Sequence, residues 1–354
     1  MSGQRLTTVA RGESRRVASL FPSFRDFVDD ALFHPASGYY STGRVRFGEG
    51  GHYDTFPLAL SPIFGHMLAQ YGYRFWRRAG EPEAFEICEL GAGNGQLCRD
   101  VLVRVTARAR REGAWRPFAS ALRYRIVERS RALIARQQEQ MGALSDKVAW
   151  TRADLAQRAV PGGVPFTAVG MVFANEVLDC LAHHKVVQLP DGRPGAVFVV
   201  PRLKRRGAAI PRMAPLPSTC DAQGRIPRHR LAAVLADERL RRSVAFEEVA
   251  LPIDVVAPLH RFVRRYYPEF YQPGVRFRPY FACPAIETLV ANTSRLYRCG
   301  EILWVDYGDT RNFHLKAPEH QKIFAGPPCS GVTVYRAPGL DGITFLVDFS
   351  VVAG

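Results

Sequence analysis

Short apolar runs recur along the middle of the chain, and each ends at a polar residue before a stretch with helical periodicity begins. The runs cover residues 85–90, 123–128, 148–155 and 168–174, and the polar residues at or next to their ends are Glu89, Glu128, Asp154 and Asn175. Alternation of such runs with helical segments predicts an α/β fold built on a mostly parallel sheet. The polar residues would then lie along the carboxyl edge of that sheet, where open α/β sheets bind ligands.

The turn after the first run is rich in glycine. Gly91, Gly93 and Gly95 alternate with other residues, and a helical pattern over 96–105 follows. Glycine lets the backbone approach a ligand closely, so strand, glycine turn and helix in this order indicate a nucleotide-cofactor site. A dinucleotide fingerprint requires its third glycine one position later, where Gln96 stands. The spacing instead resembles motif I of class I S-adenosylmethionine (SAM) methyltransferases, and a nicotinamide-dependent oxidoreductase is disfavoured.

The other strand ends extend this predicted cofactor site. Glu128 closes the second run, where a carboxylate is placed to accept hydrogen bonds from both ribose hydroxyls of a cofactor. The chain between Gly91 and Glu128 is longer than the ~20 residues usual in a dinucleotide-binding unit, so an insertion around 115–121 is expected. The predicted cofactor-binding residues are Glu89, Gly91, Gly93, Gly95, Glu128, Asp154, Leu155 and Asn175.

Sequence motifs in a fixed order are spread over nearly the whole chain. They lie at 24–27, 34–40, 55–65, 89–95, 126–130, 174–179, 305–308 and 342–349. Their order resembles the MidA family of SAM-dependent methyltransferases, which includes the mitochondrial complex I assembly factor, a protein arginine methyltransferase. The resemblance implies a class I methyltransferase (Rossmann-like) fold, SAM as the cofactor, and arginine N-methylation of a protein. Residues 51–53 and 55–61 lack the acidic residue that each segment usually carries in the family, so a non-catalytic assembly factor that kept the fold is an alternative.

Two carboxylates after the fourth run are the predicted catalytic residues. Glu176 and Asp179 match acidic positions of the family pattern. Arginine is protonated at ordinary pH, so its methylation requires carboxylates that bind the guanidinium group and leave one nitrogen facing the methyl group. As an alternative, Asn175, Glu176 and Asp179 cap and complement the N-terminus of a helix.

Histidines close to the same turn suggest a different methyl acceptor. His184 matches a histidine of the family, whereas His183 is peculiar to this chain. A histidine beside the sulfonium could act as general base towards a hydroxyl group, which would make an O-methyltransferase for a small-molecule or carrier-bound substrate. The competing interpretation is that both histidines belong to an edge strand leading into residues 185–189.

The pattern divides the chain into four consecutive parts. These are a helical N-terminal cap at 1–80, the SAM-binding Rossmann-like core at 81–189, an inserted substrate region at 190–298 and a C-terminal return to the core sheet at 299–354. The cap includes a helix over 62–76, and the return includes a buried strand at 302–306 and a last strand at 343–351. Residues 55–65 are expected to cover the cofactor as a lid, because water must be excluded from the sulfonium.

The chain is strongly basic. It carries 48 Lys and Arg against 33 Asp and Glu, a net charge of +15, and eight of the basic residues but only one acid fall within 201–230. Seven prolines between 190 and 230 argue against a helix or a central strand, so this segment is predicted to be an exposed basic insertion. It could attract an acidic partner protein, RNA or a carrier domain. Nucleic acid is not favoured, because the insertion lacks interleaved aromatic residues.

Bulk composition fits a globular enzyme. With 354 residues and a 47% apolar fraction, the chain can bury a substantial core. No apolar run approaches the ~18 residues of a membrane span. Seven cysteines without a C-x-x-C pair indicate reduced thiols rather than a disulfide framework or a zinc site. These features predict a cytoplasmic protein and leave the methyl acceptor and the oligomeric state open.

Overall fold

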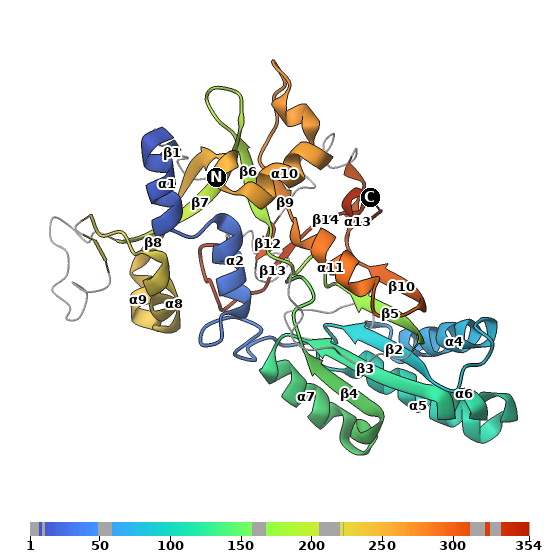
Figure 1. Cartoon of the computed structure of the whole chain (residues 1–354). Coiled ribbons are helices and arrows are strands. Elements are labelled where there is room, and N and C mark those ends of the chain that lie inside the picture. Colours follow the sequence, from blue (N-terminus) through green and yellow to red (C-terminus); the bar gives the residue numbers. More distant parts are fainter. Residues whose placement is uncertain are drawn as a thin grey trace. The chain divides into compact units, whose positions relative to one another are not determined.

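The computed structural model describes residues 7–8, 11–48, 59–157, 168–204, 220–221, 223–311, 323–325 and 334–353. The chain forms two compact units, each built on its own sheet. Unit 1 comprises Met1–Thr42, Leu181–Pro284 and Asp309–Gly354, and unit 2 comprises Gly43–Cys180 and Ala285–Gly308. Figure 1 labels the elements of both units.

Unit 2 is built on a five-stranded parallel sheet in the order β10-β5-β2-β3-β4. Its strands are β2 (Phe85–Leu90), β3 (Leu122–Glu128), β4 (Val148–Arg152), β5 (Val169–Asn175) and β10 (Cys299–Val305). Its helices are α4 (Ile63–Arg78), α5 (Gln96–Arg111), α6 (Arg116–Ala121), α7 (Arg131–Met141) and α11 (Ala285–Thr293), with short helices η1 (Gly113–Trp115) and η2 (Gly142–Lys147). The predicted α/β fold with a parallel sheet is confirmed.

The register of this sheet brings the polar strand ends together. Leu90 at the end of β2 pairs with Val127 on β3 and with Ala174 on β5. Because all five strands run in the same direction, their carboxyl ends share one edge of the sheet. That edge is where the predicted cofactor and catalytic residues lie.

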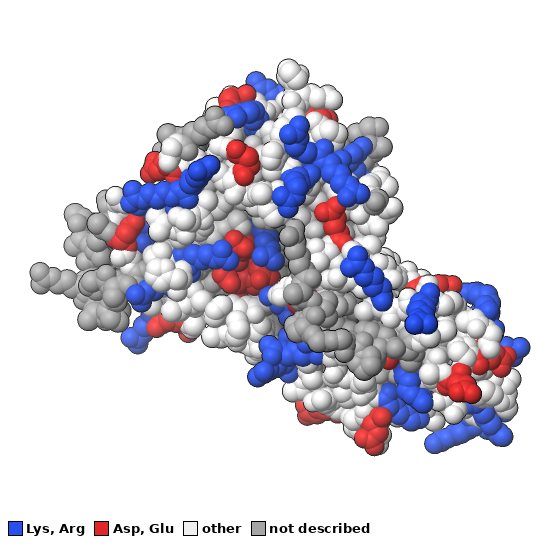
Figure 2. All heavy atoms as spheres, in the orientation of Figure 1, with Lys and Arg blue, Asp and Glu red and all other residues white. Residues whose placement is uncertain are grey.

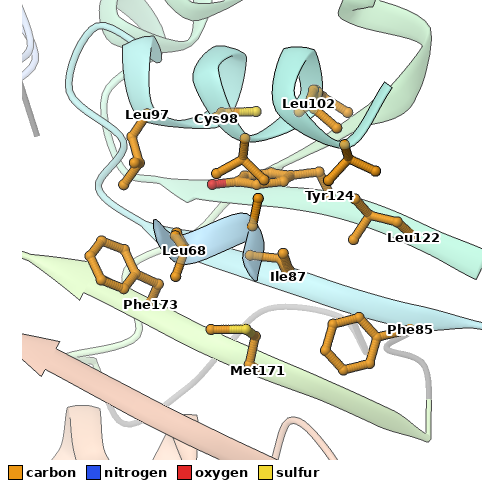
Figure 3. Packing of buried hydrophobic residues seen from close by; sticks show 14 of the residues in the cluster. Leu68, Phe85, Ile87, Leu97, Cys98, Leu102, Leu122, Tyr124, Met171 and Phe173 are labelled. Atoms are coloured by element: carbon orange, nitrogen blue, oxygen red, sulfur yellow. The ribbon is translucent and has the colours of Figure 1, made fainter. Parts of the chain in front are cut away.

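An apolar cluster fixes the helices of unit 2 on its sheet. It combines residues of α4, α5, α6 and the strands, and Trp76, Phe85 and Phe118 are among its fully buried side chains. Figure 3 shows the ring of Tyr124 between Cys98 on α5 and Ile87 on β2. Fully burying an aliphatic or phenylalanine side chain stabilises a fold by ~1.5–3 kcal/mol, so this cluster holds the start of α5 firmly against the ends of β2 and β3.

Unit 1 contains a second five-stranded sheet, in the order β1-β8-β7-β6-β9. Its strands are β1 (Thr7–Thr8), β6 (His184–Gln188), β7 (Pro194–Leu203), β8 (Val244–Pro252) and β9 (Tyr280–Ala282), antiparallel except for the β1–β8 pair. Its helices are α1 (Arg11–Leu20), α2 (Phe24–Phe33), α8 (Arg228–Ala236), α9 (Glu238–Arg242), α10 (Ala257–Tyr266), α13 (Phe349–Ala353), η4 (Ile253–Val255) and η5 (Pro268–Tyr271). Short strands lie at β12 (Ile323–Ala325), β13 (Ile343–Phe345) and β14 (Val347–Asp348), and β11 (Gly308–Asp309) lies at the boundary of the units. Strand β12 pairs with β13 in antiparallel orientation.

The prediction of a last core strand at 343–351 is wrong. This stretch forms β13, β14 and α13, all outside the parallel sheet of unit 2. Asp348 explains the break in the strand, because its Oδ1 accepts the Ser350 N–H at 3.0 Å and starts a helix. Its Oδ2 accepts the hydroxyls of Tyr267 at 2.6 Å and Tyr280 at 2.9 Å, which fixes the stretch inside unit 1.

The prediction that 190–230 holds no central strand is also wrong. Strand β7 pairs along its length with β8, and its first residues pair with β6 as well. Proline is tolerated at the first residue of a strand and where no neighbouring strand needs its N–H group. Pro194 is the first residue of β7, and Pro201 lies beyond the part of β7 that pairs with β6. The rest of the predicted basic insertion, at 205–219 and 222, lies outside the described residues.

The two units cut across the four consecutive parts expected from the sequence. Helix α4 was expected in the cap and belongs to unit 2, as does α11, which was expected in the substrate region. Strand β6 was expected in the core and belongs to unit 1. The chain crosses between the units more than once, so neither unit is a single consecutive range. The stretch around 115–121, where an insertion was expected, forms η1 and α6, and its Trp115 and Phe118 are buried in the core of unit 2.

Of the predicted lid at 55–65, residues up to 58 lie outside the described residues, and α4 begins at Ile63. Within the described ranges, no helix combines the length and apolar character needed to cross a bilayer.

Candidate functional site

The turn between β2 and α5 holds its three glycines in the left-handed region. Their φ angles are 62° at Gly91, 55° at Gly93 and 86° at Gly95. A Cβ atom on Gly93 would lie 3.3 Å from the ring of Phe47, and one on Gly91 would lie 3.2 Å from a methyl group of Val177. Any other residue would therefore strain the backbone and crowd the turn. The turn leads directly into the 16-residue helix α5, whose first N–H groups suit a negatively charged group of a ligand.

Glu128 lies at the end of β3, beside the glycine turn. Its side chain is buried, and its carboxylate accepts the Ser130 N–H at 2.8 Å and Nε2 of Gln137 at 3.2 Å. Burial raises the pKa of Glu128 to about 7, although these hydrogen bonds favour the charged form. The same Nε2 of Gln137 donates to the carbonyl of Gly93 at 3.1 Å. Gln137 on α7 thus connects Glu128 to the glycine turn.

Glu89 lies beneath the same turn. Its Oε2 accepts the hydroxyl of Tyr124 at 2.7 Å, and both residues are buried. Burial raises the pKa of Glu89 to about 7, and the neighbouring charge of Glu128 acts in the same direction. Glu89 and Glu128 together form a buried acidic pair that gains stability from ligand groups able to donate hydrogen bonds.

These residues fit SAM. Its ribose offers two hydroxyl donors and its methionine part an ammonium group, and the residues beside the turn offer buried acceptors, namely the carboxylates of Glu89 and Glu128 and the amide oxygen of Gln137. Oε1 of Gln137 is such an acceptor, because Gln137 is fully buried and this atom has no hydrogen-bond partner within the described part of the chain. The glycines leave the backbone accessible, and Glu128 lies where the sequence placed the ribose-binding carboxylate.

The other predicted cofactor-binding residues lie along the same edge of the sheet. Asp154 forms an ion pair with Arg129 at 3.2 Å and caps its own turn by accepting the Ala156 N–H at 3.0 Å. The carbonyl of Leu155 accepts Nδ2 of Asn292 at 2.8 Å. Asn175 donates from Nδ2 to Glu176 at 3.2 Å, and its Oδ1 has no partner within the described residues. The carboxylate of Asp154 is thus already bound within the protein, whereas Oδ1 of Asn175 is available to accept a hydrogen bond from a ligand.

The predicted catalytic pair lies at the ends of β5 and β10, where a third carboxylate joins it. Glu176 has a φ of 52°, which is strained for a residue with a side chain. Asp179 is 4% exposed, and its Oδ1 has no partner among the described residues. Asp306 accepts the N–H groups of Leu178 at 2.9 Å and Asp179 at 3.2 Å through Oδ2.

Two of these three carboxyl groups, Asp179 and Asp306, have raised pKa values. Burial raises the pKa of Asp179 well above its usual value, and the charges of Asp306 and Glu176 add to this effect. Burial likewise raises the pKa of Asp306 to about 7. No three His, Cys, Asp or Glu side chains in the described ranges converge as metal ligands would. The arrangement instead suits a cation that is itself a hydrogen-bond donor.

Sequence reasoning missed Asp306 as a functional residue, although a signal for it was present. Asp306 follows the apolar run of β10 in the way that Glu128 follows that of β3. The rule that polar residues at parallel strand ends line the site therefore applies to the fifth strand as well. Gln137 carried no such signal, because nothing in a helix sequence shows which residue faces a neighbouring turn.

A segment before α4 was missed as well. Arg136 on α7 donates from Nη1 to the carbonyl of Val45 at 2.6 Å and from Nη2 to the carbonyl of Gly43. These bonds fasten residues 43–47 to α7, and Phe47 then lies against Gly93. We call residues 43–47 the strap. It forms a wall of the glycine turn within unit 2.

The two histidines lie in unit 1 and form part of its antiparallel sheet region. His183 is buried, its Nδ1 lies 2.7 Å from the carbonyl of Leu181, and its ring stacks on Phe345 at 4.3 Å. His184 begins β6, which pairs with both β7 and β9 and is therefore not an edge strand. Burial lowers the pKa of His183 to about 4 and, together with the charge of Arg25, that of His184 to about 3. Imidazoles with such low pKa values are weak bases.

Comparison with known structures gives the same fold. The chain is similar to two crystal structures of proteins from Burkholderia thailandensis, one of which contains S-adenosylhomocysteine. For the complex the TM-score is 0.65 with 22% identity, over 97% of this chain and 73% of the other. For the second structure the TM-score is 0.61 with 21% identity, over 97% and 72%.

Curated relatives are matched over shorter stretches. A protein arginine methyltransferase NDUFAF7 homolog from Drosophila melanogaster is 32% identical over 187 residues, which is 49% of this chain and 40% of that protein. Human NDUFAF7, also described as a mitochondrial protein arginine methyltransferase, is 38% identical over 77 residues, or 22% of this chain and 17% of that protein. The chain thus matches less than half the length of these relatives.

The family assignment rests on a longer match. Residues 67–354 match the family described as S-adenosyl-L-methionine-dependent methyltransferase. This range contains the glycine turn, Glu128 and the three carboxylates at the ends of β5 and β10. The chain therefore belongs to this family of SAM-dependent methyltransferases, of the MidA type that its sequence motifs predicted.

Proposed function

We propose that this protein is a SAM-dependent methyltransferase that methylates an arginine side chain of a partner protein. The observation that carries the proposal is the pair formed by Glu176 and Asp179 beside Asp306, with a buried carboxylate oxygen of Asp179 left without a partner among the described residues. Such a group suits a guanidinium, which is planar, always charged and rich in donors. The names of the NDUFAF7 relatives support the same acceptor.

The cofactor would be held by residues of unit 2. Glu128 would accept the ribose hydroxyls, Gln137 would hold Glu128 and the Gly93 carbonyl in place, and the strap would shield the turn from water. When bound, SAM supplies a methyl group that its sulfonium already activates, so the protein chiefly aligns the acceptor nitrogen and excludes water.

The carboxylates have two tasks towards the acceptor. Glu176 and Asp179 would bind the guanidinium and draw its charge to one side, which leaves the opposite nitrogen more nucleophilic. A methylated guanidinium must also lose one proton. Oδ1 of Asp179 is the natural acceptor of that proton, because burial and the charge of Asp306 make this carboxyl more basic than usual.

Asp306 positions this pair and is not expected to touch the acceptor. Its Oδ2 binds the N–H groups of Leu178 and Asp179, which fixes the turn that begins at the strained Glu176. A strained backbone conformation persists only where the surrounding structure holds it in place. The two hydrogen bonds to Asp306 hold this turn in place.

The two alternative functions are less well supported. An O-methyltransferase with His184 as general base is disfavoured by the lowered pKa values of His183 and His184 and by their packing in unit 1. A non-catalytic assembly factor would keep the cofactor site but has no need of the carboxylate group. A cytoplasmic location remains a prediction, since the named relatives are mitochondrial.

The proposal is tested by incubating a native cell extract with radiolabelled SAM and the purified protein. We expect label in a protein band, methylarginine after acid hydrolysis, and loss of both in Glu176→Gln. Glu139→Gln, which removes an exposed carboxylate on α7, is the matched control and should retain full activity. Label in a small molecule, or label that survives Glu176→Gln, would contradict arginine methylation by this group. Heat on titration with SAM but no label in any fraction would favour the assembly factor.

A further inference from the structure

Unit 1 contains a cavity of about 450 Å³ that is unrelated to the glycine turn of unit 2. It lies among the end of β7, helix α9, the start of β8 and the segment at 335–340. The residues that decide its chemistry are Lys204, Glu238, Arg241, Arg242, Phe246, Tyr335 and Arg336. Its volume is in the range of cavities that bind small ligands or a few side chains of a partner.

Cationic groups dominate this cavity. Four of its lining side chains are Lys or Arg, and one is a carboxylate, so the described lining carries a formal charge of four minus one, or +3. The carboxylate of Glu238 is already bound to Arg242 at 2.5 Å. Lys204 donates to the Arg242 carbonyl at 2.8 Å and Arg241 to the Leu235 carbonyl at 3.0 Å, and these bonds fix where the two side chains lie. The cavity therefore attracts anions.

Two aromatic rings border the cavity, but packing already engages them. Phe246 and Tyr335 stack with ring centroids 5.6 Å apart and an interplanar angle of 22°. Phe246 is 8% exposed, and the hydroxyl of Tyr335 donates to the buried Glu248 at 2.7 Å. Single-stranded nucleic acids require exposed rings on which bases stack, and these rings are not available for that. Arginine forks, by contrast, bind carboxylates with two parallel hydrogen bonds.

We infer that this cavity docks the carboxylate side chains of an acidic segment on the methyl-accepting protein. The inference rests on the proposed function for the identity of the partner, whereas the binding itself needs no methyl transfer. Binding of this acidic segment would raise the local concentration of the acceptor protein. It would therefore lower the KM for the acceptor protein and leave the affinity for SAM unchanged.

The binding step is tested with the full chain and a fluorescein-labelled peptide in which glutamates flank one arginine. We measure fluorescence anisotropy at low salt, without SAM, and compare this peptide with one in which glutamine replaces each glutamate. The variant Lys204→Gln/Arg336→Gln removes two cations from the cavity. The matched control Arg230→Gln/Arg239→Gln removes two exposed arginines from α8 and α9 that do not line it.

We expect the cavity variant to bind the acidic peptide roughly 3- to 10-fold more weakly than wild type, from the sum of two partly screened charge interactions. The control variant should bind as wild type does, and both variants should keep wild-type SAM affinity, which shows that they fold. An equal loss in both variants would overturn the inference, because general charge would then explain the binding. Tighter binding of a single-stranded oligonucleotide to the cavity would also overturn it.

Methylation of the acceptor protein separates this inference from the proposed function. If methylation is normal but the cavity variant leaves peptide binding and KM unchanged, the docking site is refuted and the enzyme assignment stands. If the peptide binds through the cavity but no protein is ever methylated, the proposed function fails instead.

Discussion

At the scale of single residues, the site depends on carboxyl groups that burial makes unusually basic. Glu89 on β2 and Glu128 on β3 are both buried, and their pKa values are both raised to about 7. A ribose hydroxyl binds an ionised carboxylate more strongly than a neutral carboxyl. Cofactor affinity and fold stability should therefore both depend on pH close to neutrality, with opposite signs.

The first prediction concerns Glu128. A raised pKa means that the folded chain binds a proton that the unfolded chain releases between about pH 4.5 and 7. The free energy of unfolding should thus fall as pH rises through this window, by at most about 1.4 kcal/mol per pH unit for one carboxyl, and Glu128→Gln should flatten the slope. Urea titrations from pH 5 to 8 measure this, and SAM affinity of the wild type should rise over the same window.

Glu139→Gln is the control for this measurement, because it removes an exposed carboxyl from the same helix that carries Gln137. It should leave both the slope and the SAM affinity unchanged. A Glu128→Gln protein with wild-type SAM affinity at pH 8 would show that Glu128 serves the fold alone.

The second prediction concerns Asp306. Because it fixes the turn after β5 through two backbone N–H groups, Asp306→Asn should lower kcat by one to two orders of magnitude, since misplaced reacting groups are costly in rate. SAM affinity should change little. In the wild type, kcat/KM for the acceptor should rise as pH passes through the Asp306 pKa of about 7, as this carboxyl ionises.

Asp146→Asn removes an exposed carboxyl elsewhere in unit 2 and provides the comparison. Equal kcat values for Asp306→Asn and Asp146→Asn would remove Asp306 from the proposed mechanism. A loss of SAM affinity in Asp306→Asn would instead mean that the substitution disturbs the edge of the sheet as a whole.

At the scale of elements, hydrophobic periodicity predicted the parallel sheet well, because a buried strand requires a run of apolar residues and such a run is visible in the local sequence. Residues 85–90 became β2 with the expected bounds, and helix α5 starts at Gln96 directly after the glycine turn. The strand predicted at 343–351 failed because one residue, Asp348, caps a helix and binds two distant tyrosines. Such long-range hydrogen bonds leave no periodic signal.

The same reasoning explains which parts of the site could be predicted. Glycines and strand-end acids are visible in sequence because parallel topology itself gathers them at one edge. Gln137, Arg136 and Phe47 reach the turn only through the packing of α7 and the strap, which requires knowledge of how helix and loop are placed.

The third prediction concerns the strap. Arg136 holds the carbonyls of Gly43 and Val45, so Arg136→Gln should release residues 43–47 from α7 and open the wall of the glycine turn. Loss of hydrogen bonds from a charged donor costs about 1.5–3 kcal/mol where the site is dry, and we expect SAM affinity to fall roughly 10-fold. Titration calorimetry measures the affinity, and limited trypsin digestion at Arg44 and Arg46 should become faster.

Arg110→Gln, an exposed arginine near the end of α5, is the comparison and should affect neither property. Faster cleavage without a change in SAM affinity would mean that the strap is attached by Arg136 but does not contribute to the cofactor site.

At the scale of the whole molecule, charge is the most distinctive property. The net charge of +15 is not confined to the 201–230 segment: Figure 2 shows Lys and Arg side chains spread over the visible face, with Asp and Glu side chains among them. The distribution matters because the field of many separated charges acts over distances at which individual ion pairs have no effect. An acidic partner would be attracted before any specific contact forms.

The last prediction follows from that field. Steering by exposed charges weakens once the Debye length, ~10 Å at 0.1 M salt and ~3 Å at 1 M, becomes shorter than the distance between the approaching surfaces. The kcat/KM for an acidic protein acceptor should therefore fall several-fold between 50 mM and 500 mM salt, mainly through KM. The affinity for SAM should vary much less, because Glu128 and Gln137, which we propose to hold the cofactor, are buried. Initial rates with radiolabelled SAM and parallel calorimetric titrations at each salt concentration measure the two quantities. A fall in SAM affinity equal to the fall in kcat/KM would place the salt effect at the cofactor site and leave no role for long-range attraction of the acceptor.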